Sequence, residues 1–223
     1  MKENETNKKE KSTARYYTLN AFLKHSYGHR IKKIAIDAGF TCPNRDGTLD
    51  TRGCIFCSAG GSGDFAVPPA SVTSTEPYIS YFQAYTCTYA PIAYLDKLYR
   101  NALENPSVAG ISIATRPDCL PSEVLALLER LQSEYPDKFI WIELGLQTIH
   151  EKTALYIRRG YPLSCFTQAV KALHDIHIPV IVHVIRGLPG ENTAMMLKTI
   201  EYLNDLNIFG IKLQLLHVLK NTD

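Results

Sequence analysis

From residue 34 onward, short apolar runs alternate with longer amphipathic segments, and this rhythm limits the possible folds more than any other feature of the sequence. The apolar runs are rich in β-branched and aromatic residues and are bounded by turn residues, as expected of strands. They cover residues 34–38, 77–86, 108–117, 138–147, 179–190 and 210–219. Most of the gaps between them hold apolar residues at helical spacing, in residues 91–103, 120–135, 150–160, 164–178 and 191–208. The sequence therefore predicts repeated βα units.

Strands that alternate with helices pair into a mainly parallel sheet, so the expected fold class is α/β. Six strands are two fewer than a complete (β/α)8 barrel has, which predicts a partial (β/α)6 TIM-like barrel. The strands are nearly continuous apolar runs, as expected when both faces of a sheet are covered. We expect Ser122 to cap the helix after the third strand. The chain stops soon after the sixth strand, which predicts an exposed edge strand or a missing C-terminal part.

The composition suits one soluble domain, since 45% of the residues are hydrophobic and 21% are charged. The sequence begins with no secretory leader and contains no apolar run of transmembrane length. We therefore expect a cytoplasmic protein with no membrane part and with reduced cysteines. Residues 1–33 contain nine Lys or Arg and three acidic residues. We expect residues 1–14 to be a disordered basic tail, either solubilising or phosphate-attracting, before a core domain over residues 15–223.

Polar residues gather where the predicted strands end. In parallel α/β folds the carboxyl ends of the strands carry the active site, because the loops there converge on one mouth. The cysteine-containing loop that follows the first strand is expected to open onto the same mouth. The polar residues at the other strand ends are Gln83, Tyr85, Thr115, Arg116, Asp118, Gln147, Arg186 and His217.

Three cysteines in the loop after the first strand, Cys42, Cys54 and Cys57, have the spacing C-x11-C-x2-C. Structural zinc needs four ligands, and no histidine lies between Thr41 and Tyr89. A redox C-x-x-C pair would leave Cys42 unexplained. A [4Fe–4S] cluster takes one thiolate per iron, so three cysteines leave one iron open to a small molecule. The spacing and the position at the mouth favour an iron–sulfur site, with zinc and redox thiols as alternatives.

The sequence resembles the radical S-adenosylmethionine (radical SAM) enzymes in segments that follow the family's order. These segments are FTCPNRDGTLDTRGCIFC, YFQAYTCTYAP, SIATRPDCLP, WIELGLQTIHE and GLPGE. The long first cysteine spacer is similar to that of the elongator-type subgroup, and within it to the YhcC/YtqA-like family. The resemblance covers residues 15–223. It implies a radical SAM core domain that uses a [4Fe–4S] cluster to cleave S-adenosylmethionine (SAM) reductively and to generate a 5′-deoxyadenosyl radical.

The resemblance also implies roles for single residues. Cys42, Cys54 and Cys57 would ligate the cluster, and the open iron would bind the amino and carboxylate groups of SAM. The usual Gly-Gly-Glu motif for the methionine amino group is absent, and Gln83 and Tyr85 stand in its place. The implied SAM-binding residues are Gln83, Tyr85, Arg116, Gln147, Arg159 and Gly187.

Elongator-type relatives act on tRNA, so the resemblance implies a tRNA substrate and modification of its wobble uridine. The basic N-terminal segment is compatible with phosphate contacts. A protein or small-molecule substrate is an alternative, as is an RNA-binding protein that a metal or cluster stabilises without catalysis. The resemblance further implies a reductant such as flavodoxin or ferredoxin as a partner.

A few other residues carry chemistry that the motifs do not use. Glu143, in the middle of the fourth strand, is costly to bury unless paired. We expect it either to pair with Arg or Lys inside the barrel or to belong to the site. His183 is expected to be a hydrogen-bonded core histidine, and His217 could belong either to the site or to the surface. The isolated cysteines are expected to be small buried hydrophobic residues: Cys87, Cys119 and Cys165.

Overall fold

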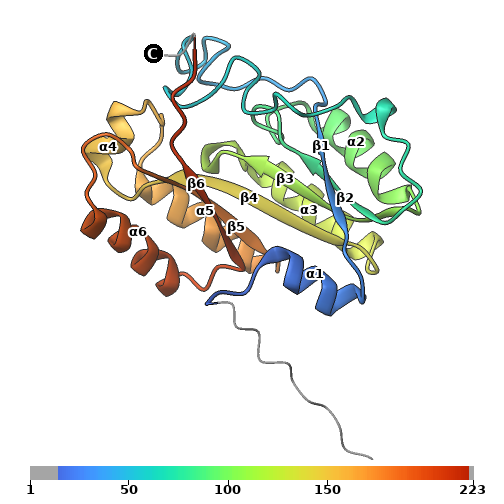
Figure 1. Cartoon of the computed structure of the whole chain (residues 1–223). Helices are drawn as coiled ribbons and strands as arrows, with labels where there is room; N and C mark the ends of the chain where they lie inside the picture. The colour runs from blue at the N-terminus through green and yellow to red at the C-terminus, as the bar shows by residue number, and fades with distance from the viewer. Residues whose placement is uncertain (1–14, 221–223) are drawn as a thin grey trace, which may run out of the picture. The chain divides into compact units, whose positions relative to one another are not determined.

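The structure, a computed structural model, describes residues 15–220 (Figure 1). The predicted basic tail at residues 1–14 lies outside the described residues, as do residues 221–223. The chain forms two compact units, residues 1–32 and residues 33–223. The predicted start of the core domain at residue 15 stays a prediction. In the described range, no helix has both the length and the apolar character that crossing a membrane requires.

The first unit contains the helix α1 (Leu19–Tyr27), which the periodicity did not predict. Both of its ends are capped. The backbone N–H of Ala21 donates to Oγ1 of Thr18 at 3.1 Å, and Gly28 closes the helix with a φ of +76°. A left-handed residue at this position favours glycine. In the sequence, Thr18 and Gly28 therefore indicate the ends of this helix more clearly than its short apolar pattern indicates the helix itself.

The second unit is built on a six-stranded sheet with the strand order β1-β2-β3-β4-β5-β6. Each strand from β2 to β6 runs parallel to its neighbour. This order confirms the α/β class and the partial barrel of six strands. The strands are β1 (Lys32–Ile36), β2 (Tyr78–Phe82), β3 (Val108–Thr115), β4 (Phe139–Gln147), β5 (Val180–Arg186) and β6 (Gly210–Leu215).

The predicted helices are present between the strands. They are α2 (Ile92–Glu104), α3 (Ser122–Glu134), α4 (Glu151–Tyr156), α5 (Leu163–Asp175) and α6 (Thr193–Asp205). Two short 3-10 turns lie at Pro69–Ser71 and Pro117–Cys119. The expectation that Ser122 caps α3 is wrong. The cap residue is Pro121, which makes no side-chain hydrogen bond, and Ser122 is the first residue of the helix.

The two faces of the sheet differ in polarity. Alternate residues point to opposite faces of a strand, and one set packs with the helices into the main hydrophobic core, for example Ile142 and Leu144 of β4 and Val182 of β5. Burying each such side chain contributes about 1.5 to 3 kcal/mol. The intervening residues, including Glu143 and His183, line a cavity instead. The near-continuous apolar runs therefore do not mean that both faces are covered.

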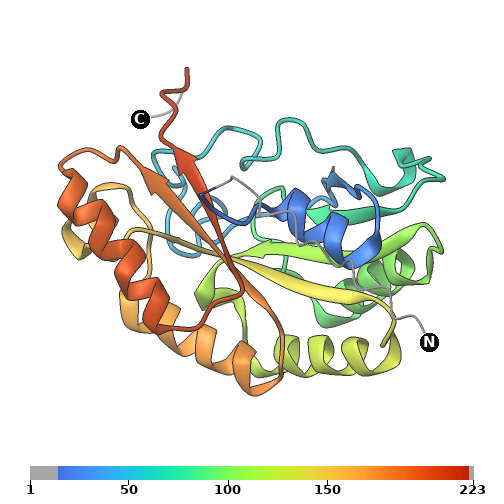
Figure 2. The same ribbon diagram turned by 60° about the horizontal axis from the view of Figure 1, so that its bottom comes forward.

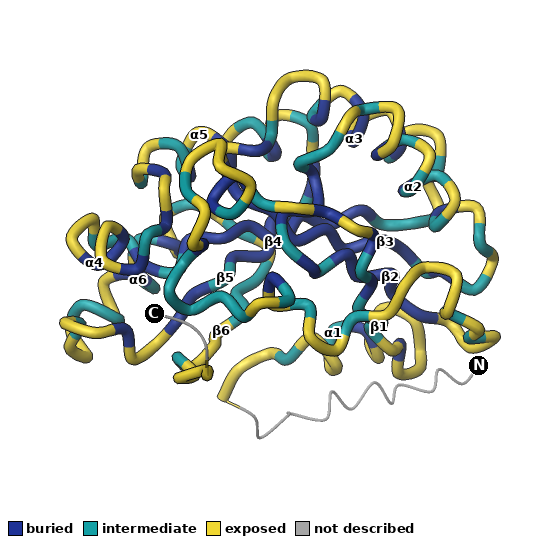
Figure 3. The backbone as a smooth tube through the Cα atoms, turned by 90° about the horizontal axis from the view of Figure 1, so that it is seen from above, coloured by how far each residue is buried: buried dark blue, intermediate teal, exposed yellow. Residues whose placement is uncertain are grey.

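The figures show how this arrangement positions a site. In Figures 1 and 2, α2, α3, α5 and α6 lie along one side of the curved sheet. Figure 3 shows buried backbone running along the central strands, with exposed segments on the outer surfaces of the surrounding helices. The concave side of the sheet is therefore left to line a lumen, and the loops that follow the strands form its mouth.

Candidate active site

A cavity of about 420 Å³ opens between the loops at the strand ends and extends into the lumen. It contains all three cysteines of the C-x11-C-x2-C motif. Five of the six residues expected to bind SAM also line it: Gln83, Tyr85, Arg116, Gln147 and Arg159. Gly187 does not line this cavity. Its backbone N–H lies 3.4 Å from the sulfur of Met196, on the side of α6.

The cysteine loop is held in a compact form by its own polar residues. Side-chain Nη2 of Arg45 donates to the carbonyls of Cys57 at 3.0 Å and Ser58 at 2.7 Å, which ties the start of the loop to its end. The N–H of Cys57 donates to the carbonyl of Cys54 at 3.0 Å, so these two residues share a tight turn. The long spacer therefore folds back on itself and brings both ends of the motif to one cavity.

Asn44 is a site residue that the sequence reasoning missed. It is 2% exposed, and its Nδ2 lies 3.3 Å from the sulfur of Cys54 and 2.8 Å from the carbonyl of Arg158. An amide that donates to a thiol or thiolate fixes the orientation of that sulfur. Asn44 directly follows Pro43 in the motif. A polar side chain so close to a cysteine in the sequence is the signal by which this residue could have been identified.

The three thiols are all free, and each is partly exposed. Burial raises the pKa of Cys54 to about 11, although the hydrogen bond from Asn44 opposes this shift. A metal ligand must be a thiolate, so the protein alone holds Cys54 in its neutral form and a positively charged group is needed to ionise it. Among residues 15–220, no three or more His, Cys, Asp or Glu side chains are grouped as ligands of one metal ion. A cluster instead takes one thiolate per iron, and three free thiols around one cavity fit that requirement.

Both arginines at the mouth are engaged by other parts of the protein. Arg116 forms two hydrogen bonds with the carboxylate of Asp118, at 2.9 and 2.7 Å. Arg159 is 1% exposed and donates to the carbonyls of Tyr161 at 2.9 Å and Thr148 at 2.7 Å. These bonds fix both guanidinium groups in place. They also occupy several of the donors with which Arg159 was expected to reach SAM.

Gln83 and Tyr85 bind the glycine-rich loop that follows the cysteines. Side-chain Nε2 of Gln83 donates to the carbonyl of Ser62 at 2.7 Å, and the hydroxyl of Tyr85 donates to the carbonyl of Ala59 at 2.8 Å. Tyr85 and Gln147 both have a φ of +63°. Left-handed backbone is costly for residues other than glycine and concentrates at functional sites. The strand ends therefore hold this loop at one wall of the cavity.

Replacing Gly61 by alanine is expected to destabilise this wall. A methyl group there would lie 2.4 Å from the ring of Tyr85, and Gly61 has a φ of +63°. Gly47→Ala is the matched control, because Gly47 has a φ of +91° and open space around the added methyl. In urea unfolding, we expect Gly61→Ala to lose about 1 to 3 kcal/mol more than the control, from overpacking. Equal losses for the two variants would contradict the close packing of Gly61 on Tyr85.

Glu143 satisfies both expectations drawn from the sequence. It forms an ion pair with Lys33 inside the half-barrel, and it lines the cavity. His183 is hydrogen-bonded, as expected, since its Nε2 lies 2.7 Å from Oε2 of Glu143. It also lines the cavity, and so does His217.

The isolated cysteines lie apart from the thiol-lined cavity. Cys87 is fully buried, and its thiol donates to the carbonyl of Ala84 at 3.2 Å. Cys119 is also buried, whereas Cys165 on α5 is partly exposed. Burial raises the pKa of Cys119 to about 12, which makes it a poor nucleophile.

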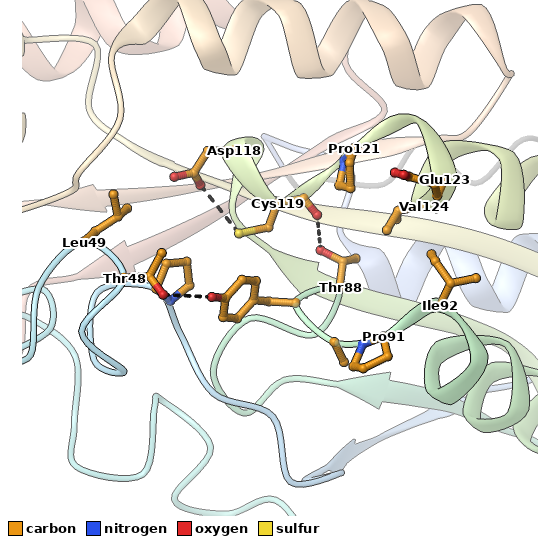
Figure 4. Close-up of a pocket in the computed structure, with 13 residues that line it drawn as sticks. Thr48, Leu49, Thr88, Pro91, Ile92, Asp118, Cys119, Pro121, Glu123 and Val124 are labelled. Atoms are coloured by element: carbon orange, nitrogen blue, oxygen red, sulfur yellow. Dashed lines mark hydrogen bonds between the residues drawn. The ribbon is translucent and has the colours of Figure 1, made fainter.

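A second pocket, of about 730 Å³, lies beside the cysteine loop (Figure 4). Thr48 and Leu49 from that loop line it together with residues that lead into α2 and α3. Its polar groups hold these segments together, since Thr88 donates to the carbonyl of Cys119 at 2.5 Å and Thr48 bonds the hydroxyl of Tyr89 at 3.0 Å. Of the polar residues expected at the mouth, Asp118 lines this pocket, but none of the three motif cysteines and none of the residues expected to bind SAM does. The thiol-lined cavity is therefore the candidate active site.

The chain is similar to several known proteins. The family model described as "Radical SAM superfamily" matches residues 51–203. YtqA of Bacillus subtilis is 45% identical, over 93% of this chain and 68% of its own length. YhcC of Escherichia coli is 37% identical, over 90% of this chain and 68% of its own length. The tRNA uridine(34) acetyltransferase of Methanocaldococcus jannaschii is 23% identical, over 74% of this chain and 38% of its own length.

Solved structures share the fold at lower identity. The coproporphyrinogen III oxidase HemN of Escherichia coli, a radical SAM enzyme, has a TM-score of 0.60 at 15% identity, over 91% of this chain and 48% of its own. The archaeal Elp3 of Methanocaldococcus infernus has a TM-score of 0.57 at 20% identity, over 66% of this chain and 39% of its own. The chain belongs to the radical SAM superfamily and, within it, to the family of YtqA and YhcC, so it is an enzyme whose cofactors are a [4Fe–4S] cluster and SAM.

Proposed function

We propose that Cys42, Cys54 and Cys57 ligate the [4Fe–4S] cluster, that SAM binds beside it at the mouth, and that the substrate is a uridine of tRNA. The observation that carries the ligand assignment is the presence of all three free thiols in one cavity at the strand ends. When bound and reduced, the cluster and SAM supply a 5′-deoxyadenosyl radical that takes a hydrogen atom from the substrate. The protein's task is to position these groups and to exclude water.

The residues around the cavity have distinct parts in this proposal. Asn44 orients the sulfur of Cys54, and Arg45 closes the cysteine loop. Gln83, Tyr85 and Gln147 hold the wall against which SAM would lie, and Arg116 supplies positive charge at the mouth. Arg159 is assigned a supporting part, because its guanidinium already binds backbone carbonyls. Gly187 does not line the cavity, so we give it no part in holding SAM.

A reductant must deliver the electron that this chemistry consumes. We propose a small one-electron carrier, such as a flavodoxin or a ferredoxin. The three cysteines are partly exposed, so we expect the carrier to approach at the cysteine loop.

Two observations support tRNA as the substrate. The similarity to a tRNA uridine(34) acetyltransferase covers 74% of this chain. The sequence also contains nine Lys or Arg residues among its first 33, and such a basic segment attracts phosphates. The half-barrel, with its lumen open at the strand ends, suits a nucleoside that is turned out of its stack.

The substrate assignment can be tested by nucleoside mass spectrometry of tRNA from cells that lack the protein. We expect a modified uridine to be lost, and to return when wild-type protein is supplied but not when Cys54→Ala is supplied. The Cys165→Ala variant is the matched control, since its thiol lies outside the cavity, and it should restore the nucleoside. An unchanged tRNA profile in the deleted cells would contradict a tRNA substrate and point to a protein or a small molecule.

A further inference from the structure

Below the mouth, polar side chains from all six strands gather around one carboxylate, that of Glu143. The sheet register pairs Tyr81 with Ser112 and His183 with Lys212. His183 and Lys212 each lie three residues before the end of their strand, which is about 10 Å below the mouth at the spacing of residues along a strand. We call this set the lumen cluster. It consists of Lys33, Tyr81, Ser112, Glu143, His183 and Lys212.

Glu143 lies at the centre of the lumen cluster, and its side chain has no exposed surface. Its Oε1 accepts hydrogen bonds from Nζ of Lys33 and from Oγ of Ser112, the latter at 2.5 Å. Its Oε2 lies 2.7 Å from Nε2 of His183. A buried carboxylate with three such partners is well satisfied. It therefore needs no hydrogen bond from Lys212.

Lys212 lies at the edge of this arrangement. Its Nζ is 3.7 Å from Oε2 of Glu143, which is too far for a hydrogen bond. It donates to the hydroxyl of Tyr81 at 3.0 Å, whereas an ammonium group has three donors. Both Lys212 and Tyr81 line the cavity. The remaining donors of Lys212 are thus available to a ligand in the lumen.

The charges of the lumen cluster do not balance. Desolvation alone would raise the pKa of Glu143, but the hydrogen bond from His183 and the charges of Lys33 and Lys212 hold it well below its usual value. Burial lowers the pKa of His183, so this imidazole is neutral at pH 7. Two lysine ammonium groups therefore surround a single carboxylate. One positive charge remains in the lumen, where the side chain of Lys212 is 33% exposed, and an anion that pairs with this partly desolvated charge would stabilise it.

We propose that Lys212, whose Nζ the hydroxyl oxygen of Tyr81 holds in place, binds an oxyanion of the substrate, a carboxylate or a phosphate, within the lumen. The inference rests on the proposed function, because it takes the lumen as the place where the substrate meets the radical. SAM is a poorer candidate for this position, since the residues expected to bind it lie at the strand ends. The other members of the lumen cluster then act as positioning residues, which hold Lys212 and Tyr81 in place: Glu143, Lys33, Ser112 and His183.

The test is the thermal unfolding temperature of the cluster-loaded chain in acetate and in inorganic phosphate, each against chloride at the same ionic strength. An anion that binds only the folded protein raises this temperature. We expect one or both anions to stabilise the wild type. For Lys212→Met, we expect the dissociation constant of that anion to rise about tenfold or more, as for the loss of a charge-assisted hydrogen bond. Stabilisation by acetate alone indicates a carboxylate, and stabilisation by phosphate alone indicates a nucleotide phosphate.

Three further measurements serve as controls for this test. Lys212→Arg keeps the charge and should retain the anion effect, which guards against simple misfolding of Lys212→Met. Lys198→Met, on the exposed side of α6, should leave the effect unchanged. Formation of 5′-deoxyadenosine from SAM by the wild type, without substrate, reports the proposed function separately, so a failure of anion binding and a failure of the proposed function can be told apart. Equal anion effects in wild type and Lys212→Met, or no effect beyond chloride, would each overturn the proposal.

Discussion

The Cys57→Ala variant is expected to form almost no 5′-deoxyadenosine from SAM and to retain much less iron than the wild type. A cluster takes one thiolate per iron, so this variant leaves two irons without a protein ligand. Removing residues that merely hydrogen-bond to a metal ligand already costs about 10- to 100-fold in affinity or activity. We therefore expect losing a ligand to cost more than about 100-fold in SAM cleavage.

The matched control for this variant is Cys165→Ala, which removes a thiol of similar exposure from outside the cavity. It should keep both its iron and its activity. Cys57 is only partly buried, so both variants are expected to fold. Iron, labile sulfide and 5′-deoxyadenosine are measured on the same anaerobic preparations. Full iron content in Cys57→Ala would show that Cys57 is not a ligand, and the assignment would then have to be abandoned.

The second large effect is expected at Glu143, in folding stability rather than in cofactor binding. Replacing it by glutamine removes the negative charge between Lys33 and Lys212 and leaves Lys33, whose side chain is only 22% exposed, without its counter-ion. Breaking a buried ion pair from one side costs about 3 to 5 kcal/mol. We therefore expect Glu143→Gln to lower the free energy of unfolding by about that amount in urea titrations.

A double variant separates the charge effect from the packing effect. Combining Glu143→Leu with Lys33→Met replaces the pair by apolar side chains, which is often neutral for stability. The double variant should therefore be more stable than Glu143→Gln. If Glu143→Gln loses less than about 1 kcal/mol, the value typical of an exposed pair, then the ion pair is not buried in solution as it is in this structure.

Much of the fold could be predicted because each strand is a short, continuous stretch of sequence with a recognisable apolar composition. Val180–Arg186 and Phe139–Gln147 are dense in β-branched and aromatic residues, and turn residues bound them. The mouth could also be predicted, because in a parallel sheet the strand ends meet at one edge. Gln83 and Gln147, which are 64 positions apart in the sequence, were placed in one cavity by this rule alone.

The lumen cluster could not be predicted, because its residues come from six different strands and meet only when the sheet curves into a half-barrel. Lys33 and Lys212 come from the first and the last strand, and no sequence period relates them. In sequence, Lys212 lies in an otherwise apolar strand, whereas Lys33 is the last residue of the basic segment that precedes the first predicted strand. Glu143 and His183 did give a signal, since a polar side chain in a buried strand needs a partner.

Long side chains were also difficult to assign from sequence. Arg116 and Arg159 were both expected to face SAM, and both do line the cavity. However, Arg116 binds Asp118, and Arg159 binds backbone carbonyls at the end of β4 and beyond it. A guanidinium group can reach in several directions from the same backbone position, so its partner depends on loops that a strand pattern does not describe.

The central claim is that the thiol-lined cavity holds a [4Fe–4S] cluster with which the chain cleaves SAM. The most direct measurement is made on the wild-type chain, reconstituted without oxygen, reduced and mixed with SAM. We predict about four irons and four sulfides per chain, broad visible absorption, and 5′-deoxyadenosine that accumulates only with reductant present. Stoichiometric zinc in place of iron, with no visible absorption and no 5′-deoxyadenosine, would contradict the account.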